Sequence, residues 1–383
     1  MILSLKSLPV LSYLCLYSCF AKCYNINMDT YYDERNKDAT VKIRELRKEL
    51  PPFCNEFFIG VENRTTPLTR LGYAYDLRIF FDFVLSELRE FRSFNTDTFG
   101  LSELDRITET HIESFLEYLN YYRFNDKEYK NDERAKARKL STLRSFFKYF
   151  FNKGKLAKNV ASKVQTPKIH EKEIIRLDVD EVAKLLDEVE FGEKLSERQQ
   201  GYHKKTKLRD LALISLLLGT GIRISECVGL NITDIDFKNY SFTVTRKGGN
   251  RKILYLPEEV ADTLRQYLQE DRLLAETDAP ALFLSMQNKR ISTRAVEVLV
   301  KKYSKLITPL KKITPHKLRS TYGTNLYRET KDIFVVAEVL GHKDVNTTKR
   351  HYAAMSEDIL RSAARVTVLR GDSVKSYDDE DEE

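Results

Sequence analysis

Cysteine is scarce in this sequence outside its first residues. Only five cysteines occur among 383 residues, and three of them, Cys15, Cys19 and Cys23, precede the part that is expected to fold. Cys54 and Cys227 remain, with no CxxC motif and no Cys/His spacing of the kind that binds zinc. This count excludes a disulfide framework and favours a reducing compartment, so we expect a cytoplasmic protein.

A long apolar run is also missing. Residues 8–21 form a mostly apolar stretch of 14 residues, which is too short to span a bilayer. The stretch follows a single lysine, Lys6, and lacks an A-x-A cleavage site, so it resembles a weak signal peptide. Because Met28 begins a segment with the composition of a natural start, we interpret residues 1–27 as an upstream extension, with secretion as the alternative. We expect no membrane partner.

Negative charge gathers at the C-terminus. All six residues from Asp378 to Glu383 are acidic, so the formal net charge of +7 for the whole chain becomes +13 for residues 1–377. A basic body of this kind favours polyanions such as nucleic acid, although dispersed Lys and Arg can equally form a solvated surface. The acidic tail, residues 371–383, is expected to be disordered.

Hydrophobic periodicity indicates a helical domain after an N-terminal extension at residues 28–64. The pattern is helical across residues 65–160, with amphipathic helices predicted at 68–91, 107–124 and 132–156. The third helix combines core aromatic residues with a basic face, which can lie along the phosphate backbone of DNA. The candidate DNA contacts on this face are Arg134, Arg138, Lys139, Arg144 and Lys148.

A linker and a mixed α/β domain follow. Residues 161–177 are polar and basic without periodicity, and they precede a domain at residues 178–370. Alternating residues at 240–246 and 252–257, joined by "KGGNR", predict a β-hairpin, and residues 281–285 are a candidate short strand. We therefore expect a mainly α fold with a small β-sheet. Its helices in this domain are predicted at 178–190, 207–218, 224–230, 258–273, 293–306, 316–328, 333–340 and 345–354.

Several charged residues of this domain are not explained by local structure. Arg223 follows the two glycines of "GTGIR" at a predicted helix start, where a cation opposes the helix dipole and suggests a bound anion. His316 and Arg319 share one helix face in the first turn after Pro315. Lys247 opens the hairpin turn, where an ammonium group can protonate a leaving oxygen. Taken alone, each is as often or more often a solvated or core side chain.

His342 and Tyr352 complete the set. His342 follows the apolar helix that ends at Gly341, and Tyr352 is the only tyrosine of its segment. A phenol ionises near pH ~10, so Tyr352 needs neighbouring cations to attack at neutral pH. Two arginines, a lysine, two histidines and a tyrosine, without a carboxylate cluster or metal-ligand set, are the inventory for phosphoryl transfer that needs no metal.

In order, spacing and context, these motifs resemble those of tyrosine recombinases of the phage-integrase and Xer type. The resemblance rests on "GTGIRISE", the hairpin lysine in "RKGGNRKILYLP", "HKLR", "LGH" and the terminal tyrosine, and it covers about residues 65–364. It implies a two-domain clamp around DNA, with a helical core-binding domain and a mixed α/β catalytic domain.

The resemblance also assigns roles around the scissile phosphate. Arg223 and Arg319 would bind the phosphate, and His342 would hydrogen-bond a nonbridging oxygen. Glu226, one helical turn after Arg223, would orient that arginine. These four residues would together hold the reacting group.

Three further residues would carry out bond breaking and proton transfer. Tyr352 would form the 3′-phosphotyrosyl link, His316 would assist proton transfer, and Lys247 would be the general acid for the 5′-hydroxyl. Tyr352 lies ten residues after His342, one more than in many relatives, so either His351 or a slightly longer loop could alter the register.

The hairpin also departs from the commoner family pattern. It reads "RKGGN" where "GKG" is the commoner order, which leaves Arg246 and Lys252 as alternative candidates for the general acid. Arg246 precedes Lys247 and Lys252 follows it in the same hairpin.

The implied activity is site-specific DNA recombination. Two double-stranded DNA sites would be synapsed by a homo-tetramer, with no ATP, metal or other cofactor, in integration or excision of a mobile element or in Xer-type dimer resolution. Two alternatives remain: a type IB topoisomerase, which shares the chemistry, and a catalytically silent DNA-binding protein with the same clamp.

Overall fold

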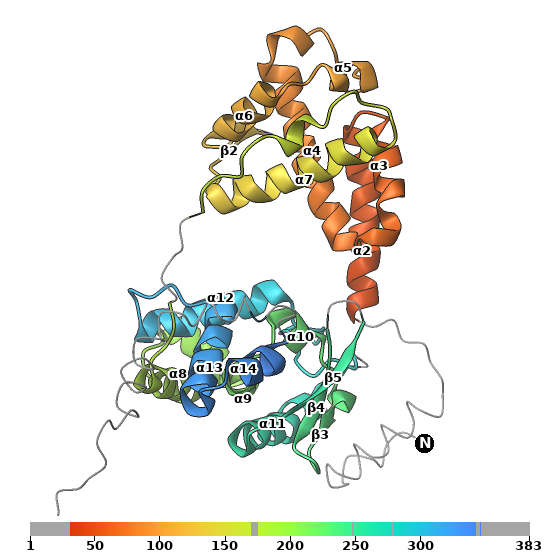
Figure 1. The fold of residues 1–383 in the computed structure, drawn as a ribbon. Coiled ribbons are helices and arrows are strands. Elements are labelled where there is room, and N and C mark those ends of the chain that lie inside the picture. The colour runs from red at the N-terminus through yellow and green to blue at the C-terminus, as the bar shows by residue number, and fades with distance from the viewer. Residues whose placement is uncertain (1–30, 170–174, 247–248, 278, 342–344, 346–383) are drawn as a thin grey trace, which may run out of the picture. The chain divides into compact units, whose positions relative to one another are not determined.

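The computed structural model describes residues 31–169, 175–246, 249–277 and 279–341 together with Val345. The described chain divides into two compact units, a helical unit that ends at residue 169 and a mixed unit that begins at residue 175 (Figure 1). The prediction of a mainly helical fold with a small β-sheet is confirmed. None of the described helices is long and apolar enough to cross a membrane.

The helical unit contains α2 (Tyr31–Leu46), α3 (Cys54–Gly60), α4 (Pro67–Glu87), α5 (Leu101–Asp105), α6 (Glu109–Tyr118) and α7 (Glu133–Asn152), with 3₁₀ turns at η1 (Arg47–Glu49), η2 (Glu62–Arg64), η3 (Arg89–Phe91) and η4 (Val160–Ser162). Side-chain caps fix where the long helices begin. The Thr66 hydroxyl accepts the Thr69 N–H at 3.3 Å, and Pro67 takes the first position of α4. Asp132 caps α7 in the same way by accepting the Ala135 N–H at 2.9 Å.

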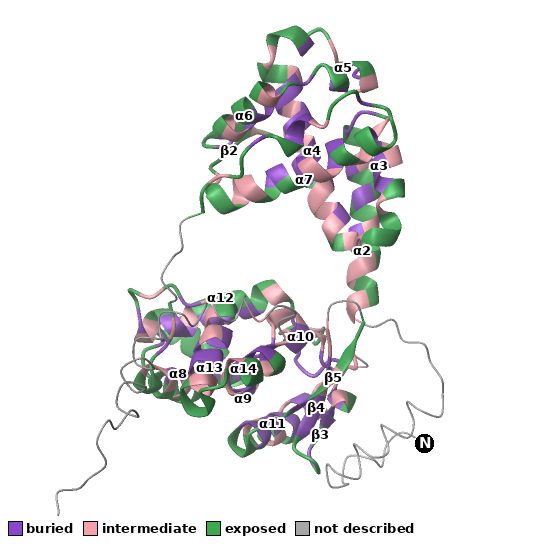
Figure 2. Ribbon diagram, viewed as in Figure 1, coloured by how far each residue is buried: buried purple, intermediate pink, exposed green. Residues whose placement is uncertain are grey.

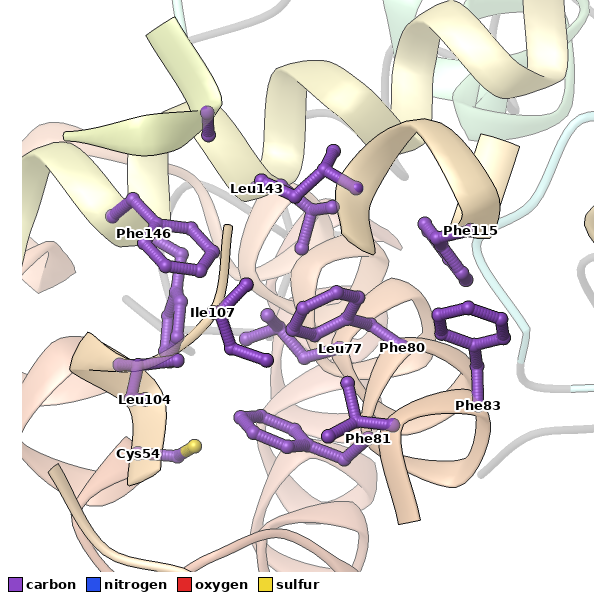
Figure 3. Packing of buried hydrophobic residues seen from close by; sticks show 14 of the residues in the cluster. Cys54, Leu77, Phe80, Phe81, Phe83, Leu104, Ile107, Phe115, Leu143 and Phe146 are labelled. Carbon is purple, nitrogen blue, oxygen red and sulfur yellow. The ribbon is translucent and has the colours of Figure 1, made fainter. Parts of the chain in front are cut away.

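Phenylalanine dominates the core of the helical unit. Phe80, Phe81 and Phe146 are buried between α4 and α7, and their rings meet edge to face (Figure 3). Such pairs add to the stabilisation from burial alone. Figure 2 shows the buried residues on the inward sides of these helices.

Residues 31–64 share this core. Ile43 and Leu46 of α2 and Phe57 of α3 are buried in the same cluster as the residues of α4 and α7. The ring centroids of Phe57 and Phe146 lie 5.1 Å apart. Residues 31–64 therefore fold with the helical unit instead of standing apart as an extension.

One segment of this unit contradicts the prediction of a continuous helical pattern. The predicted helix at 107–124 ends at Tyr118, and β1 (Tyr122–Phe124) pairs antiparallel with β2 (Lys127–Tyr129). Asn125 and Asp126 form the two-residue turn with φ of 50° and 58°. Asn and Asp tolerate positive φ, and such a turn matches the twist of a hairpin, so the local turn prevails over the helical period.

The mixed unit contains α8 (Val179–Phe191), α9 (Glu197–Thr220), α10 (Ile224–Gly229), α11 (Glu258–Glu270), α12 (Thr293–Ile307), α13 (Pro315–Thr330) and α14 (Ile333–Leu340), with 3₁₀ turns at η5 (Ile232–Asp234) and η6 (Arg272–Leu274). Its sheet has the order β3 (Ile235–Asp236), β4 (Ser241–Thr245) and β5 (Arg251–Tyr255), all antiparallel. The predicted hairpin is confirmed, because Thr245 pairs with Arg251 and the Arg246 N–H donates to the Asn250 carbonyl at 2.8 Å.

Two details of this unit differ from the prediction. Helix α9 begins at Glu197, well before the predicted start at Lys207, and the added segment is mostly exposed, with His203 and Thr206 as its buried residues. The Asp210 carboxylate accepts hydrogen bonds from Thr206 at 3.0 Å and Tyr303 at 3.1 Å. The candidate strand at 281–285 forms only two single-residue bridges, at Ala281 and Leu284.

Candidate active site

The junction between α9 and α10 places Arg223. Helix α9 ends at Gly221, which adopts the left-handed conformation with φ 61°, and Arg223 is the extended residue that begins α10. The buried Glu226 carboxylate accepts the Arg223 backbone N–H and the Arg223 Nη1, both at 2.9 Å. The same carboxylate thus caps α10 and orients the Arg223 guanidinium.

Arg319 connects three helices of the mixed unit. It lies in α13, and only 4% of the residue is exposed. Its Nη1 donates to the Gly221 carbonyl at 2.5 Å, and its Nη2 donates to the Leu340 carbonyl at the end of α14. Arg319 therefore ties the α9–α10 junction to α14 through backbone oxygens at helix C-termini.

The C-terminal turn of α14 gathers four cationic side chains. The Leu340 carbonyl accepts from Arg319 as described, and the Gly341 carbonyl accepts from Arg223 Nη2 at 3.2 Å. The two preceding carbonyls, of Glu338 and Val339, accept from Lys252 at 3.1 Å and from Arg246 at 3.0 Å. The last carbonyls of a helix lack partners within it and carry partial negative charge, so they attract cations.

The guanidiniums of Arg223 and Arg319 face the C-terminal ends of helices. Arg223 does stand at the start of a helix, but its guanidinium faces Glu226 and the C-terminal end of α14. Arg319 likewise faces carbonyls at the C-termini of α9 and α14. The dipoles of these ends favour a cation, so the protein itself holds both guanidiniums in place.

Gly341 allows the cations to approach. It ends α14 with φ 64°, a conformation that L side chains rarely adopt. A Cβ atom at this position would overlap the Arg246 guanidinium. Glycine is therefore required here both for the backbone turn and for the close approach of Arg246.

Burial and neighbouring charge affect the two hairpin cations differently. Desolvation lowers the pKa of Arg246, and the nearby Arg223 adds to this effect, while Glu226 opposes it. Lys252 Nζ donates to the Glu338 carboxylate at 2.9 Å, and this hydrogen bond lowers the pKa of Glu338. Since both side chains are engaged with α14, neither alternative candidate for the general acid is placed as a mobile donor.

The remaining predicted catalytic residues are only partly covered. His316 is exposed in the first turn of α13, one turn before Arg319, and its carbonyl accepts the Ser320 hydroxyl at 3.1 Å. Lys247, His342 and Tyr352, together with His351, lie outside the described residues. In the sequence, however, Lys247 directly follows Arg246 and His342 directly follows Gly341, the two residues that touch.

Two of the predicted DNA contacts on α7 have structural roles instead. Lys139 is buried and donates to the Asn131 side chain at 2.7 Å, and burial lowers its pKa. Arg144 donates to the Val164 carbonyl at 2.6 Å and to Thr166 at 2.9 Å, which fixes the chain after α7. Periodicity could not separate these residues from exposed ones, because a long basic side chain can lie on either border of an amphipathic helix.

Arg138 is partly engaged in an ion pair within the helical unit. Its guanidinium forms a bidentate ion pair with the buried Asp76 carboxylate, with N–O distances of 2.5 and 2.7 Å, while 55% of its side chain stays exposed. Arg134 and Lys148 are exposed, so of the five candidates they remain the best placed for DNA. Among the residues that the structure covers, no group of three His, Cys, Asp or Glu side chains is placed to hold a metal ion.

Comparison with known proteins identifies the family. Residues 176–358 match the phage integrase family. Tyrosine recombinase XerC of Caldanaerobacter subterraneus subsp. tengcongensis is 34% identical over 344 residues, which cover 86% of this chain and 92% of the relative. This chain belongs to the tyrosine recombinase family. The recombinase is accordingly an enzyme that breaks and rejoins DNA at specific sites, and the predicted resemblance is confirmed.

Further relatives and solved structures agree with this assignment. Tyrosine recombinase XerS of Streptococcus agalactiae is 31% identical over 343 residues, covering 80% of the recombinase and 93% of the relative. The fold is similar to XerH site-specific recombinase bound to a palindromic difH substrate, with a TM-score of 0.62, 17% identity and coverage of 92% and 94% of the two chains. It is also similar to the Tn1549 transposon integrase in complex with a circular intermediate DNA, with a TM-score of 0.58, 18% identity and coverage of 82% and 99%.

Proposed function

We propose that this recombinase exchanges strands between two double-stranded DNA sites in the manner of Xer recombinases, through a covalent link at Tyr352. The observation that carries the proposal is the convergence of Arg223 and Arg319 on two adjacent carbonyls of α14. His342 is the next residue in the chain, and Tyr352 follows ten residues later. The Xer names of the relatives that are 31% to 34% identical favour this role over integration of a mobile element.

The charge of the two arginines suits them to a phosphodiester. Backbone carbonyls carry only partial charge, so the hydrogen bonds of Arg319 to Gly221 and Leu340 do not cancel its positive charge. Glu226 offsets part of the charge of Arg223, whose side chain is still 40% exposed. Two oriented guanidinium forks can bind the nonbridging oxygens, whose negative charge grows in the transition state.

In the proposed reaction the Tyr352 phenol oxygen attacks phosphorus and the bond to the 5′-oxygen breaks. His316 takes the phenol proton, and Lys247 gives a proton to the leaving 5′-oxygen. The 5′-hydroxyl of the partner strand then attacks the phosphotyrosine and releases Tyr352. One phosphoester bond forms for each that breaks, so the exchange requires no ATP.

The two units would divide the work. We assign the helical unit to DNA binding, with Arg134 and Lys148 on the phosphate backbone, and the mixed unit to catalysis. The partner is a pair of double-stranded DNA sites in the cytoplasm, held by a homo-tetramer. The lambda integrase tetramer bound to a Holliday junction, which has a similar fold with a TM-score of 0.55, supports this assembly.

Trapping on a suicide substrate tests the proposal. Full-length protein is incubated, with EDTA present, with a nicked duplex carrying the site that it protects in a footprint. The wild type should form an SDS-resistant protein–DNA complex and Tyr352→Phe should not. Tyr255→Phe, which alters an exposed tyrosine of β5, is the matched control and should behave as wild type. Binding of the site by the wild type without a covalent complex would contradict the proposal and favour a silent DNA-binding protein.

A further inference from the structure

The β4–β5 hairpin is attached to α14 through Arg246. This residue follows β4 and opens the turn, since its N–H donates to the Asn250 carbonyl. Its guanidinium extends to α14, where Nη2 donates to the Val339 carbonyl at 3.0 Å and the group lies against Gly341. The contact leaves no room for a side chain at Gly341, so the two elements interlock at this point.

A second attachment comes from the other strand. Lys252, which pairs across the sheet with Val244, donates to the Glu338 carbonyl at 3.1 Å and to the Glu338 carboxylate at 2.9 Å. The hairpin thus holds two adjacent carbonyls of α14 with one side chain from each side of its turn. Such a double attachment restrains rotation as well as translation of the hairpin on the helix.

The attachment points adjoin those of the site arginines. Carbonyls 338 and 339 bind the hairpin, and carbonyls 340 and 341 bind Arg319 and Arg223. All four belong to one helical turn and its cap, where hydrogen bonds fix the spacing of the oxygens. The position of the hairpin is therefore set relative to the two arginines by a single short element.

We propose that Arg246 and Lys252 are positioning residues, which dock the hairpin on the C-terminal turn of α14 so that protonation of the leaving group stays in register with the phosphate-binding arginines. The inference rests on the proposed function. The inference goes beyond the proposed function because these two residues neither bind the phosphate nor donate the proton. They act through the hairpin that they hold. Loss of either should slow the departure of the 5′-oxygen and leave DNA binding unchanged.

A substrate whose leaving group needs no proton distinguishes positioning of the general acid from phosphate binding and from general stability. In a duplex with sulfur at the bridging 5′-position, attack by Tyr352 breaks the P–S bond, and the thiolate leaves unprotonated because thiols are far more acidic than alcohols. Covalent capture is timed with saturating DNA of each type. We expect Arg246→Gln and Lys252→Gln to be slowed at least ~10-fold with oxygen and to return to within a few-fold of wild type with sulfur, because general-acid catalysis contributes about 10²–10⁴-fold.

Control variants give each outcome a meaning. Arg251→Gln removes an exposed arginine of the same hairpin, whose partner is Asp234 at 3.3 Å, and should match wild type with both substrates. Lys247→Gln should behave like the positioning variants, and Arg223→Gln should be slow with both substrates. Arg246→Lys keeps one donor and should be intermediate with oxygen.

Two results would overturn the inference. Equal slowing of Arg246→Gln and Lys252→Gln with oxygen and sulfur would assign them to phosphate binding or to general stability, and wild-type rates with oxygen would show that the attachment does not matter. If the wild type itself formed no covalent complex with either duplex, the proposed function would fail instead. Thermal unfolding of each variant shows whether the fold is retained, and Lys252→Gln, on the less buried contact, tests the inference if Arg246→Gln unfolds.

Discussion

Arg138 in the helical unit and Arg319 in the mixed unit are both helical arginines with two hydrogen-bonded nitrogens, but their partners differ in charge. Arg138 pairs with the buried Asp76 carboxylate, whereas Arg319 donates to the carbonyls of Gly221 and Leu340. A carboxylate neutralises a guanidinium, while a carbonyl orients it and leaves its charge in place. The ion pair of Arg138 with Asp76 therefore neutralises its charge, whereas the hydrogen bonds of Arg319 to two carbonyls orient the guanidinium without neutralising it.

The other basic residues of the two units differ in where they gather. Lys139 and Arg144 of α7 hold the helical unit together, and their donors are engaged with neighbouring loops. In the mixed unit Arg223, Arg246 and Arg319 converge on the end of α14. The mixed unit thus places guanidiniums beside one another, at an electrostatic cost that the α14 carbonyls offset.

Replacing Arg319 or Arg138 with glutamine should produce the largest difference between the two units. Arg319→Gln should slow covalent capture by about 10²–10³-fold, the usual cost of removing one preorganised donor from a developing anion. Arg138→Gln should instead lower the free energy of unfolding by about 1–3 kcal/mol, since it leaves the Asp76 carboxylate buried without its cation. Its capture rate at saturating DNA should equal that of wild type. A catalytic defect in Arg138→Gln, or none in Arg319→Gln, would break the comparison.

Two glycines with positive φ, one in each unit, extend the comparison of the two units to the backbone. Gly341 and Gly154, which follows α7, have φ of 64° and 68°, but only Gly341 faces a guanidinium. Gly154→Ala should cost about 1 kcal/mol for the left-handed backbone, and Gly341→Ala about 2–4 kcal/mol because overlap with Arg246 adds to that strain. Denaturant unfolding measures both. Equal costs would show that Arg246 is not fixed against Gly341.

The smallest effects concern DNA binding by α7. Lys148→Gln should weaken binding of the footprinted site and reduce the slope of log K against log salt by about 1, as expected for one lost phosphate contact. Lys139→Gln should leave that slope unchanged, because the ammonium group is buried against Asn131. The slopes come from titrations at several salt concentrations. A reduced slope for Lys139→Gln would return it to the DNA-binding face.

Much of the fold follows from local pattern. The bounds of α14 and the hairpin with its Gly-rich turn were predicted from sequence, because apolar periodicity and turn residues act over a few positions. The turn at Asn125 and Asp126 was missed, since two polar residues inside a helical pattern look like a solvated face. The start of α9 was missed because the residues before Lys207 are mostly polar and exposed, and the buried His203 among them lies against the Val189 carbonyl of α8, a contact that no local pattern reveals.

The site was predictable only as a set of side chains. Arg223 and Arg319 were found from motifs and spacing and Glu226 from the family resemblance, and the structure brings them to one place. Their acceptors on α14 are backbone carbonyls, which every residue has, so no residue type marks them in the sequence. The roles of Arg246 and Lys252 depend on those acceptors and for the same reason could not be predicted.

The central claim is that Arg223 and Arg319 act by their charge on the scissile phosphate. The most direct measurement is covalent capture by Arg223→Gln on two duplexes, one with the normal phosphate and one with a methylphosphonate, in which a methyl group replaces a charged nonbridging oxygen. The account predicts a defect of about 10²–10³-fold with the phosphate and near wild-type capture with the methylphosphonate, because the neutral group no longer needs the cation. An equal defect with both duplexes would contradict it and show that Arg223 serves the structure of the α9–α10 junction.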